Sequence, residues 1–175
     1  MILRSLALAL AALALAACED RAPFEKACDD GDAAACVKLG DMLAKGLGGP
    51  MDKKAADKVL ARACDAGDAA ACAFGGDVAY ARDDADSRRM LLAACRLGHQ
   101  ESCVDVAWMF LHGEGGDADA TEADALLAGA CKAGEPDGCF FLGLERAARG
   151  EDGAAELFAK ACSLGDPVAC GRGTP

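Results

Sequence analysis

Apolar residues along the chain follow a helical period in five segments, each of which contains two cysteines eight positions apart. In four segments, two apolar residues stand five and four positions before the first cysteine, and an alanine directly precedes it. These positions share one face of an α-helix. The apolar pairs are Val59/Leu60, Met90/Leu91, Leu126/Leu127 and Leu157/Phe158. Leu39, Val106 and Leu142 stand three positions after the second cysteine, so the pattern predicts one helix before and one helix after each pair.

The five segments form an internal repeat with a tight turn inside each cysteine pair. The first cysteines stand at 28, 64, 95, 131 and 162, which gives intervals of 36, 31, 36 and 31 residues. A glycine follows each of them by three positions and can end a helix in the left-handed conformation. A residue that can cap the next helix comes directly after the glycine. The glycines are Gly31, Gly67, Gly98, Gly134 and Gly165, and the capping residues are Asp32, Asp68, His99, Glu135 and Asp166.

Other positions mark where the helices begin and how closely they pack. Pro136 and Pro167 stand at first helical positions, where the missing N–H has no cost. We expect the aspartates twelve positions before three of the first cysteines to cap the helices there, and small residues four positions after the second cysteines to let a neighbouring helix approach closely. The aspartates are Asp52, Asp83 and Asp119, and the small residues are Gly40, Gly76, Ala107 and Gly143.

The spacing of the ten repeat cysteines predicts five local disulfides. In an antiparallel helical hairpin, residues at equal distances from the turn face each other, and small neighbours allow the close approach that a disulfide needs. The predicted pairs are Cys28–Cys36, Cys64–Cys72, Cys95–Cys103, Cys131–Cys139 and Cys162–Cys170. Zinc ligands are usually more closely spaced, and only His99 and His112 could join these thiols. We therefore expect no metal or cofactor, and an oxidising compartment.

The eleventh cysteine, Cys18, ends an apolar N-terminal run. Residues 1–4 are positively charged, and residues 5–17 are rich in leucine and alanine but too short to span a bilayer. The ending Leu15-Ala16-Ala17-Cys18 resembles the bacterial lipobox, which implies a signal peptide over 1–17 and lipidation of Cys18. The alternatives are an ordinary cleaved secretory signal and an uncleaved membrane anchor. We expect a lipidated N-terminus and linker at 18–23, a repeat solenoid at 24–170 and a tail at 171–175, in a cell-envelope protein.

Charge and composition narrow the classes of partner. The net charge is −11, and it becomes −12 when residues 1–17 are removed with Arg4. Phosphate backbones would repel such a chain, so nucleic acid is not expected as a partner. Aromatic residues make up only 5% of the chain, so alanine and cysteine supply much of its apolar content. Such a core needs disulfides or stacking between repeats for its stability.

Residues 24–170 resemble a known repeat family. Leu39-Gly40-x-Met42-Leu43-x-x-Gly46-x-Gly48, Asp52-x-x-x-Ala56 and Ala63-Cys64-x-x-Gly67-Asp68-x-x-x-Cys72 look like the Sel-one-like (Sel1-like) repeat, a relative of the tetratricopeptide repeat. The cysteine spacing is similar to that of the cysteine-rich Hcp-type proteins. The resemblance implies an all-α fold: an α/α solenoid, or superhelix, of disulfide-linked helical hairpins. Phe74-Gly75-Gly76 and Val106-Ala107 depart from the family's Leu-Gly.

The resemblance also implies a groove. In tetratricopeptide-type solenoids the helix that carries Leu-Gly lines the concave side, and its outward positions here are two and five residues past the second cysteine. These are Lys38/Asp41, Phe74/Asp77, Asp105/Trp108 and Phe141/Leu144. Phe74, Trp108 and Phe141 could anchor a peptide or protein partner, or they could fill gaps between repeats. The first hypothesis is therefore a membrane-anchored periplasmic or surface scaffold for protein–protein interaction.

Catalytic chemistry has little support in the sequence. Hcp-type proteins are commonly described as β-lactamases or penicillin binders, which is the alternative that the resemblance implies. None of the serines Ser87, Ser102 and Ser163 is expected to have a lysine as its base, and Ser102 is expected to contact Cys103 instead. His99 is expected to be a cap and His112 to end a helix. A thiol oxidoreductase would need C-x-x-C at a helix start. We name no catalytic residue.

Overall fold

The computed structural model describes residues 20–80 and 84–172, which contain ten α-helices and no strand. The expected signal peptide, Cys18 and the capping role of Asp83 lie outside these ranges. The helices are α2 (Ala22–Asp29), α3 (Ala33–Lys45), α4 (Lys53–Asp65), α5 (Ala69–Tyr80), α6 (Asp84–Arg96), α7 (Gln100–His112), α8 (Ala120–Ala133), α9 (Pro136–Arg149), α10 (Ala154–Ser163) and α11 (Pro167–Cys170). The predicted all-α class is therefore confirmed.

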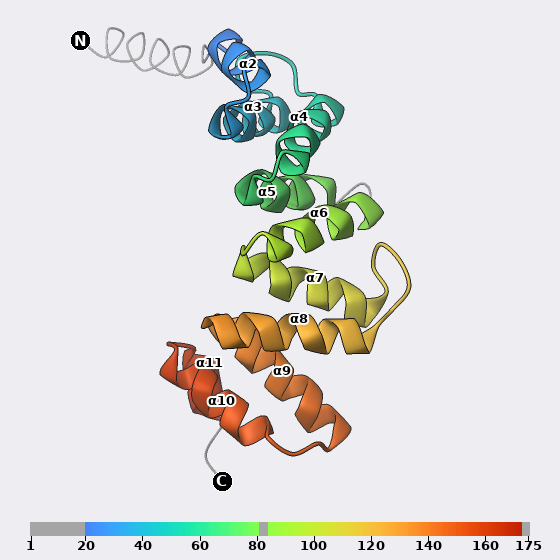
Figure 1. Ribbon diagram of the computed structural model, residues 1–175, viewed down its shortest axis with the longest axis vertical. Helices are drawn as coiled ribbons and strands as arrows, with labels where there is room; N and C mark the ends of the chain where they lie inside the picture. The colour runs from blue at the N-terminus through green and yellow to red at the C-terminus, as the bar shows by residue number, and fades with distance from the viewer. Residues whose placement is uncertain (1–19, 81–83, 173–175) are drawn as a thin grey trace, which may run out of the picture.

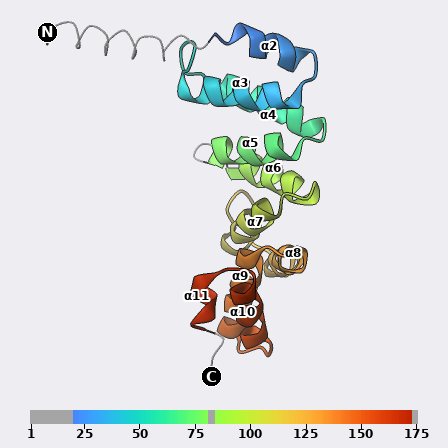
Figure 2. The same cartoon turned by 90° about the vertical axis from the view of Figure 1, so that its left-hand side faces the viewer.

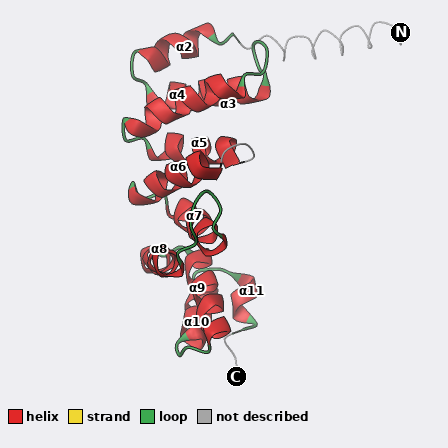
Figure 3. Cartoon of the chain, turned by 90° about the vertical axis from the view of Figure 1, so that its right-hand side faces the viewer, coloured by secondary structure: helices red, strands yellow, loops and turns green. Residues whose placement is uncertain are grey.

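Helices α2 to α10 stack in sequence order along the long axis of the molecule, and the short α11 lies beside α10 (Figure 1). Each packs against the next, and α3 also contacts α5 while α7 contacts α9. The helix direction turns along the stack: α3 runs across the view in Figure 2, whereas α8 is seen nearly end-on. Figure 3 shows the same layers from the opposite side. This arrangement is the α/α solenoid of helical hairpins that the repeat predicts.

The turns inside the hairpins have the predicted chemistry. All five turn glycines have positive φ, between 94° and 106°, which side-chain-bearing residues rarely adopt. The carboxylates of Asp32, Asp68 and Asp166 accept hydrogen bonds from backbone amides of the following helix. His99 is also a cap, since its Nδ1 accepts from the Ser102 amide at 3.3 Å. Glu135 differs, because its side chain makes no capping bond to α9.

Five disulfides join the two cysteines of every repeat pair, each across one hairpin turn. They are Cys28–Cys36, Cys64–Cys72, Cys95–Cys103, Cys131–Cys139 and Cys162–Cys170. Their Cα atoms lie 4.4 to 4.7 Å apart, far closer than the usual distance between helix axes. Side chains next to the bridges are accordingly small: Ala94 and Ala130 are completely buried beside two of them.

Close helix packing explains the glycines that follow the second cysteines. A Cβ at Gly40 would lie 2.7 Å from the Leu60 side chain, and one at Gly143 would lie 2.8 Å from the Phe158 ring. Both neighbours belong to the following helix and are buried. The prediction that these positions must be small is confirmed, and the contacts join each hairpin to the next.

Two arginines fix the glycine-rich loops that end the longer repeat units. Arg21 donates to four carbonyl oxygens at the end of α3 and in the loop after it, at 2.6 to 3.2 Å. Arg88 on α6 donates to the carbonyls of Glu114 and Asp117 in the loop after α7, and its guanidinium lies 3.7 Å from the Phe110 ring centroid. Both arginines precede their cysteine by seven residues. Each loop is therefore wrapped around a guanidinium that satisfies its free carbonyls.

Ser87 is a buried polar exception in the core. It is 0% exposed, and its hydroxyl has no hydrogen-bond partner among residues 20–80 and 84–172. The equivalent positions of the neighbouring units are the fully buried Ala56 and Ala123. Ser87→Ala should therefore raise the free energy of unfolding by about 1 kcal/mol, because it removes an unsatisfied hydroxyl without opening a cavity. Chemical denaturation followed by circular dichroism measures this change.

Ser102→Ala is the matched control for that prediction. Ser102 is equally buried, but its hydroxyl lies 3.0 Å from Nδ1 of His99. Its removal should lower the free energy of unfolding, in the opposite direction to Ser87→Ala. Equal effects of the two substitutions would contradict the assignment.

Candidate functional site: a groove along α5, α7 and α9

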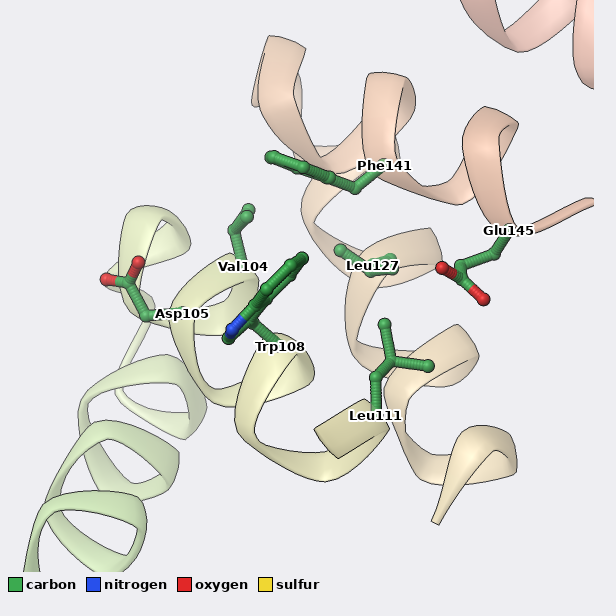
Figure 4. Close-up of a pocket in the computed structure, with 7 residues that line it drawn as sticks. All are labelled: Val104, Asp105, Trp108, Leu111, Leu127, Phe141 and Glu145. Carbon is green, nitrogen blue, oxygen red and sulfur yellow. The ribbon is translucent and has the colours of Figure 1, made fainter. Parts of the chain in front are cut away.

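An apolar pocket of about 190 Å³ opens between α7 and α9 (Figure 4). Its lining residues are Val104, Asp105, Trp108 and Leu111 of α7, Leu127 of α8, and Phe141 and Glu145 of α9. Trp108 lies in the middle of this group, with Phe141 on one side and Leu111 on the other. Trp108 is 47% exposed, whereas Leu127 beneath it is buried. The pocket thus presents a large aromatic surface to solvent above a packed floor.

Aromatic contacts hold the Trp108 ring in place. His112, one turn later on α7, stacks against it with ring centroids 3.9 Å apart, and the His112 Nδ1 lies 2.9 Å from the Trp108 carbonyl oxygen. Phe141 meets Trp108 edge-on at 6.4 Å. Phe140 supports Phe141 at 5.5 Å and contacts the buried Phe158 of α10 at 5.8 Å. The exposed indole is therefore preorganised by rings that reach into the core.

A second pocket of about 200 Å³ continues the same surface toward α5. Its lining residues are Asp77 and Tyr80 of α5, Leu91 of α6, and Asp105 and Met109 of α7. Asp105 lines both pockets, and it stands one turn before Trp108 on α7. We call the two pockets together the groove. It runs from Asp77 on α5, past Asp105 and Trp108, to Glu145 on α9.

The electrostatics of the groove are acidic. Partial burial raises the pKa of Asp105 above the usual aspartate range, and the negative charges of Asp77 and Glu101 raise it further. Partial burial also raises the pKa of Asp77, against the opposing effect of His99. The two carboxylates therefore lie within electrostatic range of each other on a partly desolvated surface. A negative charge at either position is less favourable here than in open water.

The outward positions inferred from the repeat are only partly brought together. Asp77, Asp105, Trp108 and Phe141 line the groove, whereas Lys38, Asp41, Phe74 and Leu144 do not. Phe74 is half-buried and packs against the Leu60–Met90 cluster, which is the gap-filling alternative. Phe141 also packs partly against the core beneath it, and Trp108 is the most exposed of the three aromatics.

Sequence reasoning missed five contributors to the groove: Tyr80, Val104, Met109, Leu111 and Glu145. Tyr80 and Leu111 both stand eight positions after the second cysteine of their unit. Continuing the helical period from five to eight positions past that cysteine would have found them. Tyr80 donates a hydrogen bond to the Glu114 carboxylate at 2.8 Å, which ties the loop after α7 to the rim.

One expectation about the serines was wrong. Ser102 was expected to lie away from any base, but its Oγ lies 3.0 Å from Nδ1 of His99. The hairpin turn places a cap residue three positions before the buried face of the next helix, and this makes the contact. The pair has the spacing of a nucleophile and its base, but Ser102 is 1% exposed and the same nitrogen caps α7. A substrate could not reach this hydroxyl.

The Ser163 hydroxyl also makes a contact within its own helix. It donates a hydrogen bond to the Lys160 carbonyl at 2.7 Å, at the end of α10. In the described ranges, no three histidine, cysteine, aspartate or glutamate side chains gather as a metal site would require. The groove, with its exposed aromatic ring and carboxylates, is therefore the candidate binding surface.

Two observations concern the cellular environment. Five disulfides in one small chain are typical of an oxidising, extracytoplasmic compartment. Separately, none of the helices between residues 20 and 172 that the structure describes has both the length and the apolar character of a membrane span.

Comparison with known proteins rests on structure. No family model matches the chain, and no curated protein matches its sequence. A protective antigen of uropathogenic Escherichia coli with an SLR fold superposes with a TM-score of 0.72 at 20% identity, over 87% of this chain and 35% of its own. A Sel1 repeat protein from Oxalobacter formigenes gives 0.72 at 23% identity, over 83% and 45%. The chain spans less than half of either protein.

Cysteine-rich protein B of Helicobacter pylori is similar over nearly all of its own length. It superposes with a TM-score of 0.53 at 26% identity, over 70% of this chain and 95% of that protein. The repeat spacing, the disulfide across each hairpin turn and these neighbours agree with the resemblance found in the sequence. The chain therefore has the Sel1-like repeat fold, and its five disulfides fit the cysteine-rich, Hcp-type subgroup.

Proposed function

We propose that this chain is a rigid repeat scaffold of the cell envelope that binds a peptide or protein partner in the groove. The observation that carries the proposal is Trp108, which is 47% exposed in the wall of a pocket with an apolar floor. A tryptophan that is held in one orientation and left half in water loses little side-chain entropy when a partner covers it. Large aromatic residues in such surroundings contribute much of the energy of many interfaces.

The disulfides support a scaffold role for this surface. A groove made by three separate hairpins keeps its shape only if the hairpins keep theirs. The Cys95–Cys103 bridge closes the hairpin that carries Trp108, and Cys131–Cys139 closes the hairpin that carries Phe141. Both walls of the pocket are therefore preorganised before a partner binds.

Membrane anchoring through Cys18 is the second part of the proposal. Leu15-Ala16-Ala17-Cys18 supports it, because this sequence resembles a lipobox after an apolar run of signal-peptide length. Acyl chains on this cysteine would hold the scaffold at a membrane. Cys18→Ser should move the protein from the membrane to the soluble envelope fraction, and unchanged fractionation would contradict the anchor while leaving the groove proposal intact.

Trp108→Ala should weaken partner binding by at least tenfold. Peptides that bind the purified oxidised protein are first selected from a displayed random library. Binding is then measured by calorimetry for the wild type and the variant. Truncation of a central aromatic at an interface commonly removes 2 kcal/mol or more, which is about thirtyfold in affinity.

Leu97→Ala is the matched control. Leu97 is 46% exposed, almost the same as Trp108, but it lies at a hairpin turn outside the groove. Its substitution should leave binding unchanged. If the selected peptides bind both variants as tightly as the wild type, the groove is not the binding surface.

A further inference from the structure

We propose that the groove selects a partner segment in which a lysine or arginine stands next to an apolar side chain. The cationic group would lie between Asp77 and Asp105, and the apolar side chain would enter the pocket of Trp108 and Phe141. The inference rests on the proposed function and specifies the chemistry of the partner that the groove accepts.

Within the described ranges, Asp77 and Asp105 differ from many other acidic side chains of the chain, because neither forms an ion pair with a lysine or arginine. Asp41 on the equivalent helix α3 pairs with Lys45 at 2.6 Å, and Asp124 on α8 pairs with Arg149 at 2.6 Å. The negative charge of the groove is therefore left for an external cation.

The surroundings of the two carboxylates favour such a cation. Each is partly desolvated, and the negative charges of Asp77, Glu101 and Asp137 surround Asp105. His99 is the titratable group that opposes them. Both carboxylates have a raised pKa in the free protein, so a bound cation would stabilise their charged forms and gain energy from doing so.

The position of Asp105 indicates a peptide rather than a small free cation. Asp105 lines the acidic pocket and also the apolar pocket, one turn before Trp108. A ligand that fills both must carry a positive group and an apolar group a few ångströms apart, as adjacent side chains of a peptide do. The Trp108 ring can contact either group, because aromatic faces also attract ammonium and guanidinium groups. Glu145 lies at the far end, where it pairs with Arg149 at 4.0 Å, so the unpaired negative charge is at Asp77 and Asp105.

The charge of the whole chain acts in the same direction. A net charge of −11 attracts basic segments at long range and repels acidic ones, most strongly at low ionic strength. Complementary charge would therefore raise the association rate as well as the selectivity of the groove.

Three matched peptide pools test the inference. The pools share random apolar and small residues and differ only in two fixed positions, which are lysine, glutamine or glutamate. Trp108 is the only tryptophan of the chain, so its fluorescence emission reports directly on the groove. The lysine pool should bind about tenfold more tightly than the glutamine pool, and added salt should reduce the difference. The glutamate pool should not shift the emission.

Charge-removing variants locate the effect. Asp105→Asn and Asp77→Asn should each weaken binding of the lysine pool by about fivefold and leave the glutamine pool unchanged. Asp152→Asn removes one exposed charge from the turn after α9, outside the groove, and should change neither affinity. Circular dichroism checks that each variant is folded, and the two aspartates are tested separately so that a fold defect in one does not decide the result.

The outcomes separate this inference from the proposed function. Equal affinity for the lysine and glutamine pools, with both lost in Trp108→Ala, would overturn the charge selectivity and retain the groove as a peptide site. The absence of any emission shift with all three pools would overturn both. A response to free spermidine equal to that of the lysine pool would show a small-cation site instead of a peptide site.

Discussion

Reduction of the five disulfides should unfold the repeat region at room temperature. Each bridge closes a loop of about nine residues, which destabilises the unfolded chain by about 2.5 kcal/mol in the entropic model. Five independent bridges together match the whole free energy of unfolding of a typical domain, about 5–15 kcal/mol. Large aromatic residues are scarce, and many of the buried residues are alanine or cysteine, so packing cannot replace the bridges. Far-UV circular dichroism with and without a phosphine reductant measures the loss of helix.

A single-bridge variant sets the scale for that result. Cys131→Ala with Cys139→Ala removes one bridge and keeps both side chains small, so it should lower the free energy of unfolding by about 2–3 kcal/mol and leave a folded protein. Full helical signal and an unchanged denaturation midpoint after complete reduction would show that inter-repeat packing alone holds the solenoid.

The fold could be predicted from the sequence because its determinants are local. Each hairpin turn is specified within nine residues by two cysteines, a glycine that adopts positive φ and a cap such as Asp32. The same specification repeats five times, and this made the helix order and bridge pattern visible without any long-range contact. Even His99 was identified as a cap, because it takes the place that aspartate has in other units.

The groove could be predicted only in part because it depends on how neighbouring units are rotated. Phe74 and Phe141 hold the same position in their repeats, yet Phe74 packs toward a core cluster while Phe141 also lines a pocket. Which of two equivalent side chains meets solvent depends on the turn of the helix direction along the stack, and no local pattern encodes that turn.

The role of the two arginines that hold the loops was not predicted from the sequence, for a different reason. Arg21 and Arg88 stand seven positions before their cysteines, only in units that are followed by a glycine-rich loop. The sequence contains this association of an arginine with a glycine-rich loop. Its physical cause is visible only in the structure, where each loop wraps around a guanidinium group.

The same glycine-to-alanine substitution should have opposite effects at two helical positions. At Gly40 of α3, the new Cβ would lie 2.7 Å from two carbons of Leu60, which is completely buried. Leu60 belongs to the following helix and cannot move into solvent, so Gly40→Ala should lower the free energy of unfolding by about 1–3 kcal/mol. At Gly129 of α8, nothing lies within 4 Å of the added Cβ. Gly129→Ala should raise the free energy of unfolding by about 0.5–1 kcal/mol through helix propensity.

Gly40→Ala and Gly129→Ala together separate the effect of side-chain packing on the free energy of unfolding from the effect of helix propensity. Both positions are helical, and the chemical change is identical. Denaturant titration of the two oxidised variants beside the wild type gives the two differences directly. Stabilisation by both would mean that Leu60 can move aside at little cost and that α3 and α4 pack loosely. A loss at Gly40 with a gain at Gly129 would place the specificity of repeat stacking in the small residues after each second cysteine. At Gly40 and Gly143 these residues lie directly against a side chain of the following helix, so they limit how closely successive hairpins stack.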